Sequence, residues 1–246
     1  MDIVILTALG VGGATMIGAL IGFVFGELSQ KVSGAVLGFA AGVMLSAAFT
    51  GLIMPSLLEG RKFAVLISSL GIISGAVCLD LIDRLIPHGG GECHSCTESE
   101  RKRRVLLFVL AIAIHNIPEG IAAGVGFGLG NTADALLIAG AIALQNLPEG
   151  MVIIAPMLSA GISKGKTILI ALATGLVEVI GTFVGYFAVG ISNGLLPFLL
   201  AFAGGTMLYV VCDEMIPEIH RGGDGRTASY ATLVGFVLML AFSELL

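Results

Sequence analysis

The chain has 246 residues, of which 57% are hydrophobic and only 12% are charged, and its mean hydropathy is +1.04. A soluble domain is nearer half apolar and about a quarter charged, so this composition predicts a protein that crosses a membrane several times. The net charge of −5 comes without a basic face or basic domain, which excludes nucleic acid as a partner.

Apolar stretches of about twenty residues, long enough to cross a bilayer, recur along the whole chain. We expect one transmembrane domain over residues 1–246, all-α, with eight transmembrane helices. These helices are expected near residues 3–26, 33–57, 63–86, 105–129, 133–158, 165–190, 197–217 and 228–246. The connections between them are short, apart from a polar loop at residues 87–104.

The basic residues indicate how these helices are oriented. All of the 12 Lys and Arg residues except Arg61 and Lys62 fall on one set of alternate helix ends and loops. Basic residues accumulate on the cytoplasmic side of membrane proteins. We therefore expect a multi-pass protein of the cell membrane, with both termini outside and the 87–104 loop in the cytoplasm.

The 87–104 loop contains a Cys-x-x-Cys pair, Cys93 and Cys96, with His88 and His94 close by. Two thiolates and two imidazoles are a ligand set for a tetrahedral metal site. A single Cys pair is a weak signal, whereas two pairs are a strong one. A regulatory or delivery site for metal is therefore a hypothesis, and a plain polar loop remains the alternative.

Two nearly identical segments lie in the fourth and fifth expected helices. Residues 111–120 read AIAIHNIPEG and residues 141–150 read AIALQNLPEG. Pro118 and Pro148 each remove a backbone N–H and clash with the preceding turn, so we expect a kink in both helices. Each kink leaves a backbone carbonyl without its usual partner, close to polar side chains in the middle of the membrane.

Five polar side chains near the centres of helices four to six make this region a candidate cation site. His115 and Glu119, like Gln145 and Glu149, are four positions apart and share one helix face. With Glu178 they bring three carboxylates to one depth without a basic partner there, and such acids cannot all stay ionised in a dry site. They must be protonated, hydrated or matched by a bound cation, and one or two divalent ions with proton exchange resolve the imbalance most simply. The mixture of imidazole, carboxylate and amide suits Zn(II), Fe(II), Cd(II) or Mn(II).

Three further residues are candidates for the same site. Asn116 and Asn146 each follow a first ligand by one position, and either complete a second ion site or cap interrupted helices. The thioether of Met44 in the second helix is a further possible ligand. A purely structural role, as a buried and hydrogen-bonded group, is the alternative for Glu178 and also for the duplicated pairs.

A second polar cluster lies at the expected cytoplasmic end of the seventh helix. Asp213, Glu214, Glu218 and His220 surround Pro217 there. A polar exit path for the ion and ordinary solvated helix ends are both consistent with this pattern.

The chain carries signs of an internal inverted repeat. The segments 111–120 and 141–150 lie in consecutive helices, which must cross the membrane in opposite directions. Residues 41–55 of the second helix also resemble residues 203–217 of the seventh. Inverted repeats with irregular helices near the midplane are typical of transporters, so we expect an inverted-repeat transporter bundle.

At these residues the sequence resembles the ZIP (Zrt/Irt-like protein) family of divalent metal transporters, over essentially the whole chain. Residues 115–120 fit the family's motif in the fourth helix, and Gln145 stands where many members have His. The resemblance implies a homodimer that moves ions inward, by an elevator-like shift of one helix bundle.

The resemblance also implies two ion positions. The first would have as ligands His115, Glu119, Gln145 and Glu149, with Met44 near its entrance. The second would have as ligands Asn116, Glu119, Asn146, Glu149 and Glu178. Some family members have Asp at the position of Asn146, and the neutral amide puts the second ion in doubt.

We therefore expect transport of divalent transition-metal ions into the cytoplasm, with zinc as the main substrate and cadmium, iron or manganese as others, and no enzymatic activity. One alternative is an intramembrane metal-dependent hydrolase, which needs a metal-bound water and a general base. The usual His-Glu-x-x-His pattern of such enzymes is absent. The other alternative is a proton-coupled transporter of an organic solute, which predicts activity without metal.

Overall fold

The computed structural model describes residues 1–25, 29–85, 97–191, 193–221 and 225–245, and within these ranges it contains helices and no strand. The α-helices are α1 Asp2–Phe25, α2 Gln30–Ala47, α3 Met54–Glu59, α4 Ala64–Leu85, α5 Glu98–Gly126, α6 Thr132–Ser159, α7 Lys164–Ile191, α8 Leu196–Val210, α9 Ile216–Arg221 and α10 Gly225–Leu245. Eight segments of the described chain are long and apolar enough to cross a membrane, which confirms the predicted all-α, eight-span class. The loop residues Cys93, Cys96, His88 and His94 lie outside the described residues, so the metal-binding loop stays a prediction.

The fourth spanning helix begins earlier than its apolar stretch predicts. Because α5 starts at Glu98, the loop predicted at residues 87–104 is wrong over its last seven positions. Thr97 and Glu100 form a capping box, in which the Glu100 N–H donates to Thr97 Oγ1 at 3.3 Å and the Thr97 N–H donates to Glu100 Oε2 at 2.9 Å. These reciprocal bonds satisfy two backbone donors at the helix start, so the helix extends through polar residues outside the apolar run.

The second and seventh spans each contain a short stretch of π-helix. Residues Ala48–Ile53 separate α2 from α3, and residues Val211–Met215 separate α8 from α9. Pro55 and Pro217 follow these stretches closely, at matching places in the two segments that the sequence related. Within α5 and α6, by contrast, the helix continues unbroken through its central proline. Departures from α-helical geometry of this kind concentrate at functional sites.

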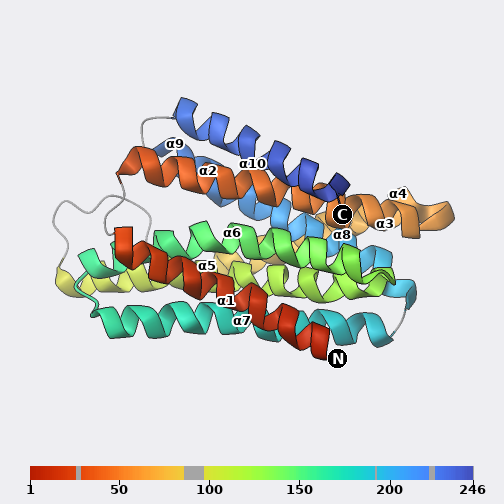
Figure 1. Ribbon diagram of the computed structural model, residues 1–246, viewed down its shortest axis with the longest axis horizontal. Coiled ribbons are helices and arrows are strands. Elements are labelled where there is room, and N and C mark those ends of the chain that lie inside the picture. Colours follow the sequence, from red (N-terminus) through yellow and green to blue (C-terminus); the bar gives the residue numbers. More distant parts are fainter. Residues whose placement is uncertain (26–28, 86–96, 192, 222–224, 246) are drawn as a thin grey trace.

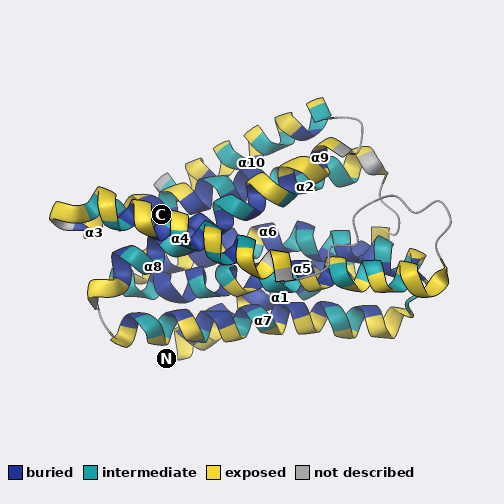
Figure 2. Ribbon diagram, turned by 180° about the vertical axis from the view of Figure 1, so that it is seen from behind, coloured by how far each residue is buried: buried dark blue, intermediate teal, exposed yellow. Residues whose placement is uncertain are grey.

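The spanning helices form two groups (Figure 1). Helices α1, α5, α6 and α7 pack together in one group, and α2, α4, α8 and α10 pack together in the other. Contacts of α2 with α6 and of α5 with α8 join the two groups. The buried residues lie mainly along these inner helix faces, as the dark stretches of the ribbon show (Figure 2).

The packing follows the inverted repeat that the sequence predicts. The repeat matches the first three spans with the last three, so α1 corresponds to α7, α2 to α8 and α4 to α10. It also matches the fourth span, α5, with the fifth, α6. The α1–α6 pair then corresponds to the α7–α5 pair, and the α2–α10 pair corresponds to the α8–α4 pair. These four pairs have the most extensive contacts in the described structure. The match extends to single residues, since Gly120 packs on the backbone oxygen of Glu178 and Gly150 packs on that of Thr15.

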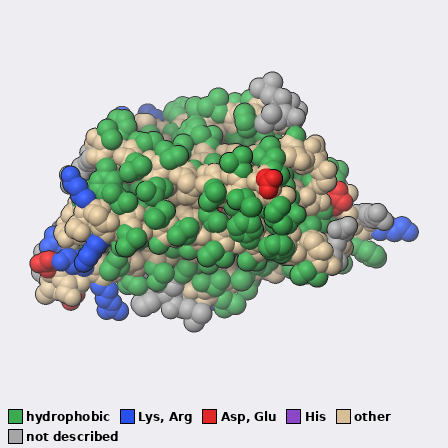
Figure 3. Space-filling model, turned by 60° about the horizontal axis from the view of Figure 1, so that its bottom comes forward, with side chains coloured by type: hydrophobic (Ala, Val, Ile, Leu, Met, Phe, Trp, Pro, Cys, Tyr) green, Lys and Arg blue, Asp and Glu red, His purple; other side chains and the backbone are tan. Residues whose placement is uncertain are grey.

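The outer surface is apolar over much of its area. Large hydrophobic side chains are exposed along the outward faces of the spanning helices. Figure 3 shows such side chains covering the middle of one face, with Lys and Arg side chains toward its two ends. An apolar band of this size, with Lys and Arg side chains toward its ends, has the form of a surface that contacts hydrocarbon.

Candidate metal centre

The predicted polar residues come together inside the first helix group. His115, Asn116 and Glu119 lie on α5, and Gln145 and Asn146 lie on α6, and all five are buried. Glu178 on α7 is also fully buried, whereas Glu149 on α6 is partly exposed. The helices approach one another closely because glycines at their crossings let backbone meet backbone.

The Glu178 carboxylate is held by three uncharged donors from three other helices. Its Oε1 accepts hydrogen bonds from Thr15 Oγ1 at 2.8 Å and from Asn116 Nδ2 at 2.6 Å. Its Oε2 accepts a hydrogen bond from Asn146 Nδ2. The four residues join α1, α5, α6 and α7 at one point, and Thr15 is a member of this network that the sequence did not indicate.

The two asparagine side chains have a determined orientation. Each Nδ2 faces Glu178 and also a backbone carbonyl, that of Thr174 at 3.4 Å from Asn116 and that of Val11 at 3.3 Å from Asn146. Because carboxylate and carbonyl oxygens only accept hydrogen bonds, the amide NH₂ must face them and the amide oxygen must face away. The alternative that these asparagines cap interrupted helices is wrong, because both helices are unbroken and both side chains bond to other helices.

A set of buried polar atoms beside this network has no hydrogen-bond partner in the described structure. Glu119 interacts electrostatically with Glu149 and Glu178, and the amide of Gln145 lies beside it. The unpartnered atoms are Asn116 Oδ1, Asn146 Oδ1, both carboxylate oxygens of Glu119, and Oε1 and Nε2 of Gln145. Each buried, unpaired polar group costs about 1–3 kcal/mol, and a charged group costs more. A cation coordinated by the oxygens would remove much of this cost.

His115 is paired with an acid that the sequence pattern did not assign to the site. Its Nε2 lies 2.6 Å from Oε1 of Glu214, which belongs to the π-helical stretch of the seventh span. Glu149 interacts electrostatically with both residues. The pair therefore connects the first helix group to the second at the level of the site.

The predicted acidic cluster of the seventh span is divided in the structure. Asp213, Glu218 and His220 are exposed, whereas Glu214 is the partly buried member that faces α5. A signal in the sequence was available, because Glu214 lies within the apolar span while its neighbour Pro217 disturbs the helix around it. The sequence alone did not indicate which of the four side chains faces inward.

Met44 lies among apolar side chains. It is fully buried on α2 within a hydrophobic cluster that also contains Met207, its counterpart in the repeat. Its role as a ligand stays a prediction.

The described structure holds no compact group of imidazole, thiolate and carboxylate ligands at this site. Within the described ranges, no three His, Cys, Asp or Glu side chains lie close enough together to hold one metal ion. The unpartnered oxygens belong to side-chain amides as well as to Glu119, so these amides are candidate ligands too.

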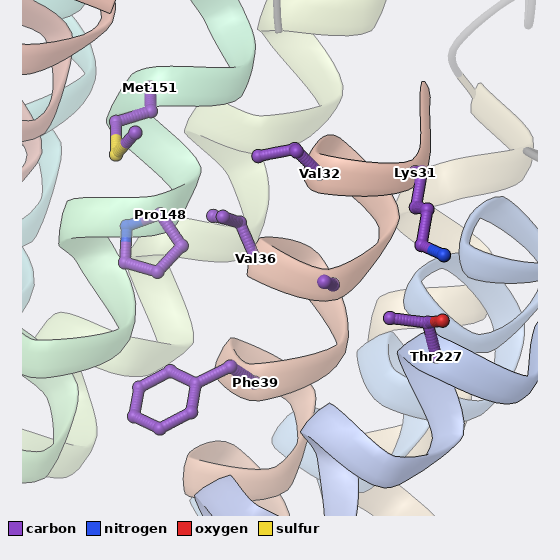
Figure 4. Close-up of a pocket in the computed structure, with 8 residues that line it drawn as sticks. Lys31, Val32, Val36, Phe39, Pro148, Met151 and Thr227 are labelled. Carbon is purple, nitrogen blue, oxygen red and sulfur yellow. The ribbon is translucent and has the colours of Figure 1, made fainter. Parts of the chain in front are cut away.

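A pocket of about 490 Å³ lies between the two helix groups, and it differs from the polar site in its lining. Figure 4 shows Pro148 and Met151 of α6 facing Val32, Val36 and Phe39 of α2 across it. Its walls are mostly apolar, with Lys31 and Thr227 as the polar lining residues, and they contain no carboxylate, imidazole or thiolate for a divalent ion. The candidate site lies instead among the closely packed helices of the first group.

Comparison with known proteins identifies relatives over almost the whole chain. Residues 84–243 match the sequence profile of the family described as ZIP Zinc transporter. The chain is 39% identical over 239 residues to the zinc transporter GufA of Myxococcus xanthus, and the alignment covers 93% of each protein. It is 38% identical over 237 residues to the zinc transporter ZIPB of Bordetella bronchiseptica, covering 92% of this chain and 76% of the relative. It is also 33% identical to the zinc transporter ZIP11 of Homo sapiens, covering 93% of each. All three relatives are named as transporters rather than enzymes.

Proposed function

This chain belongs to the ZIP family of zinc transporters, and we propose that it carries zinc across a membrane through the polar site between α5, α6 and α7. The observation that supports this site best is the set of buried oxygens that have no hydrogen-bond partner. They lie inside the membrane-spanning part of the chain, where polar atoms without partners are most costly. The hydrolase and the proton-coupled organic transporter have no support from the relatives.

The proposed ligands combine oxygen and nitrogen atoms of moderate affinity. They are His115, Asn116, Glu119, Gln145, Asn146 and Glu149. A site of this kind, without thiolates, can release the ion that it binds, as transport requires. Because Glu149 is partly exposed, it offers the first contact for an ion that arrives at the buried Glu119.

We further propose the direction and the setting of transport. The ion moves into the cytoplasm, through a homodimer in the cell membrane that has both termini outside and residues 87–104 inside. The concentration of basic residues on one set of helix ends supports this orientation. Cadmium, iron and manganese are proposed as further substrates, because the mixed ligand set does not exclude these borderline ions. Met44 is proposed as a soft ligand near the entrance.

The proposal is tested by ion uptake into proteoliposomes that contain a metal-sensitive dye. We expect the wild-type chain to give saturable uptake of Zn(II), and comparison with Cd(II), Fe(II) and Mn(II) to rank the substrates. Protein-free liposomes are the control for leakage. If folded protein admits none of the four ions, the chain is not a divalent metal transporter.

Replacing Glu214 should weaken transport without abolishing it. In Glu214→Gln the charged partner of His115 is lost, while the shape of the side chain is kept. Partners that orient a metal ligand are typically worth about 10- to 100-fold in affinity or activity. We therefore expect zinc uptake to fall by about 10-fold, measured as the initial rate at low zinc.

The neighbouring exposed acid provides a matched control for this variant. Asp213→Asn makes the same kind of change one residue away, at a side chain that faces outward. Its uptake should stay within about two-fold of wild type. Equal rates in the two variants would contradict a positioning role for Glu214.

A further inference from the structure

Glu178 differs from the other buried acids of the site in having its hydrogen-bonding capacity largely used. Three donors, from Thr15, Asn116 and Asn146, already point at its two oxygens. Glu119 is equally buried, yet neither of its oxygens accepts a hydrogen bond of ordinary geometry in the described structure, although the amide of Gln145 lies beside it. The carboxylate of Glu119 is therefore more available to a cation than the carboxylate of Glu178.

The donors around Glu178 oppose the binding of a cation there. Each amide N–H presents the positive end of its dipole to the carboxylate, so a divalent ion on the same oxygens would meet these hydrogens. A second contact also fixes the orientation of each amide, because each Nδ2 lies within hydrogen-bonding distance of a carbonyl on a neighbouring helix. For Asn116 this is the carbonyl of Thr174 on α7, and for Asn146 it is that of Val11 on α1. Turning either amide to admit an ion at Glu178 would bring its oxygen against these acceptors.

The same network also fixes where the oxygen atoms of the two amides point. With Nδ2 fixed on Glu178, the Oδ1 atoms of Asn116 and Asn146 face away from it, and both are buried without a partner among the described residues. Asn116 is three positions from Glu119, and Asn146 is three positions from Glu149, so each amide lies beside a carboxylate on its own helix. Glu178 thus orients two neutral oxygen ligands toward the acids that remain available.

We propose that Glu178 is a positioning residue rather than a ligand, and that each chain holds one divalent ion at this site instead of two. The inference rests on the proposed function, since it specifies how the transport site is built. The hydrogen-bonded group of Thr15, Asn116, Asn146 and Glu178 takes the place that the family resemblance assigns to a second ion.

Asn146 is the residue on which this arrangement depends. An aspartate there has no hydrogen to donate, so Glu178 would lose its partner on Oε2 and would face a second carboxylate instead. Two buried carboxylates in contact require a proton or a cation between them. With zinc at a concentration high enough to displace the proton, the change Asn146→Asp should therefore convert the network into a second cation site.

The test is a count of bound zinc ions on the purified full-length chain, by equilibrium dialysis followed by metal analysis. All variants carry Cys93→Ser and Cys96→Ser, so that the thiols of the loop do not add to the count. We expect one zinc ion per chain for this background and two for Asn146→Asp. Adding Glu178→Gln to Asn146→Asp should return the count to one. Glu178→Gln alone should keep one ion, with an affinity lowered by about 10- to 100-fold because the amides lose their orientation.

A matched control uses the same chemical change on the same helix. Asn131→Asp alters an exposed N-cap of α6, where aspartate caps as well as asparagine, so the count should stay at one. Two ions in the background protein, reduced to one by Glu178→Gln, would overturn the proposal and make Glu178 a ligand. A count of one in Asn146→Asp would also overturn it. Folded protein that binds no zinc and gives no uptake would instead refute the proposed function.

Discussion

Glu119→Gln should abolish zinc uptake while leaving the metal-free protein at least as stable as wild type. Glu119 is almost completely buried, and both of its oxygens lack hydrogen-bond partners in the described structure. Its ionised form is therefore costly in the empty protein, and either a proton or a bound cation must offset that cost. Removing the charge removes that cost together with the principal ligand. Since even partners of a ligand are worth about 10- to 100-fold, uptake should fall below about one hundredth of wild type.

Two measurements on the same samples test this expectation. The first is the initial rate of zinc uptake into proteoliposomes, and the second is the melting temperature of the detergent-solubilised protein with and without zinc. Zinc should raise the melting temperature of wild type, because a ligand of the folded state stabilises it, and should not raise that of Glu119→Gln. Glu59→Gln, at the exposed end of α3, is the matched control and should behave as wild type. Normal uptake by Glu119→Gln would remove this residue from the site.

Gly12→Ala should destabilise the protein and reduce transport, although residue 12 has no polar group in its side chain. Gly12 and Gly175 pack against each other where α1 crosses α7, and a Cβ on either one would overlap the backbone oxygen of the other. Backbone cannot rotate away, so the two helices must separate, at a cost of about 1–3 kcal/mol. Thr15 and Glu178 lie one turn further along the same two helices, so the separation should also stretch their 2.8 Å hydrogen bond.

The adjacent glycine provides a control that differs by one position. A Cβ at Gly13 meets no atom within 4 Å, so Gly13→Ala adds the same methyl group to α1 without a clash. We expect the melting temperature to fall by about 5 °C in Gly12→Ala and to stay level or rise in Gly13→Ala, where alanine is the better helix former. Zinc uptake should follow the same order. Equal melting temperatures in the two variants would mean that the α1–α7 crossing can widen freely.

The sequence by itself determined the membrane class and the eight spans, and it selected most residues of the proposed site. Hydropathy is a local property, because each apolar run must be long enough to cross the hydrocarbon whatever its neighbours are. Intramembrane acids are likewise recognisable without a structure, because their cost depends on depth in the bilayer more than on fold. The duplicated segments 111–120 and 141–150 also indicated the inverted repeat, because similar sequences in consecutive helices tend to pack in similar ways.

The tertiary structure decided which atoms of those residues are available to an ion. The bond between Thr15 and Glu178 joins positions 163 residues apart, and the bond between Asn116 and Glu178 joins positions 62 residues apart. No local pattern specifies such contacts, because they depend on how helices cross and where glycines let backbones meet. For the same reason Glu214 was grouped with exposed acids in the sequence, although it lies against His115 in the fold. Sequence thus selected the polar residues, and helix packing divided them into those that hold the site and those left to bind the ion.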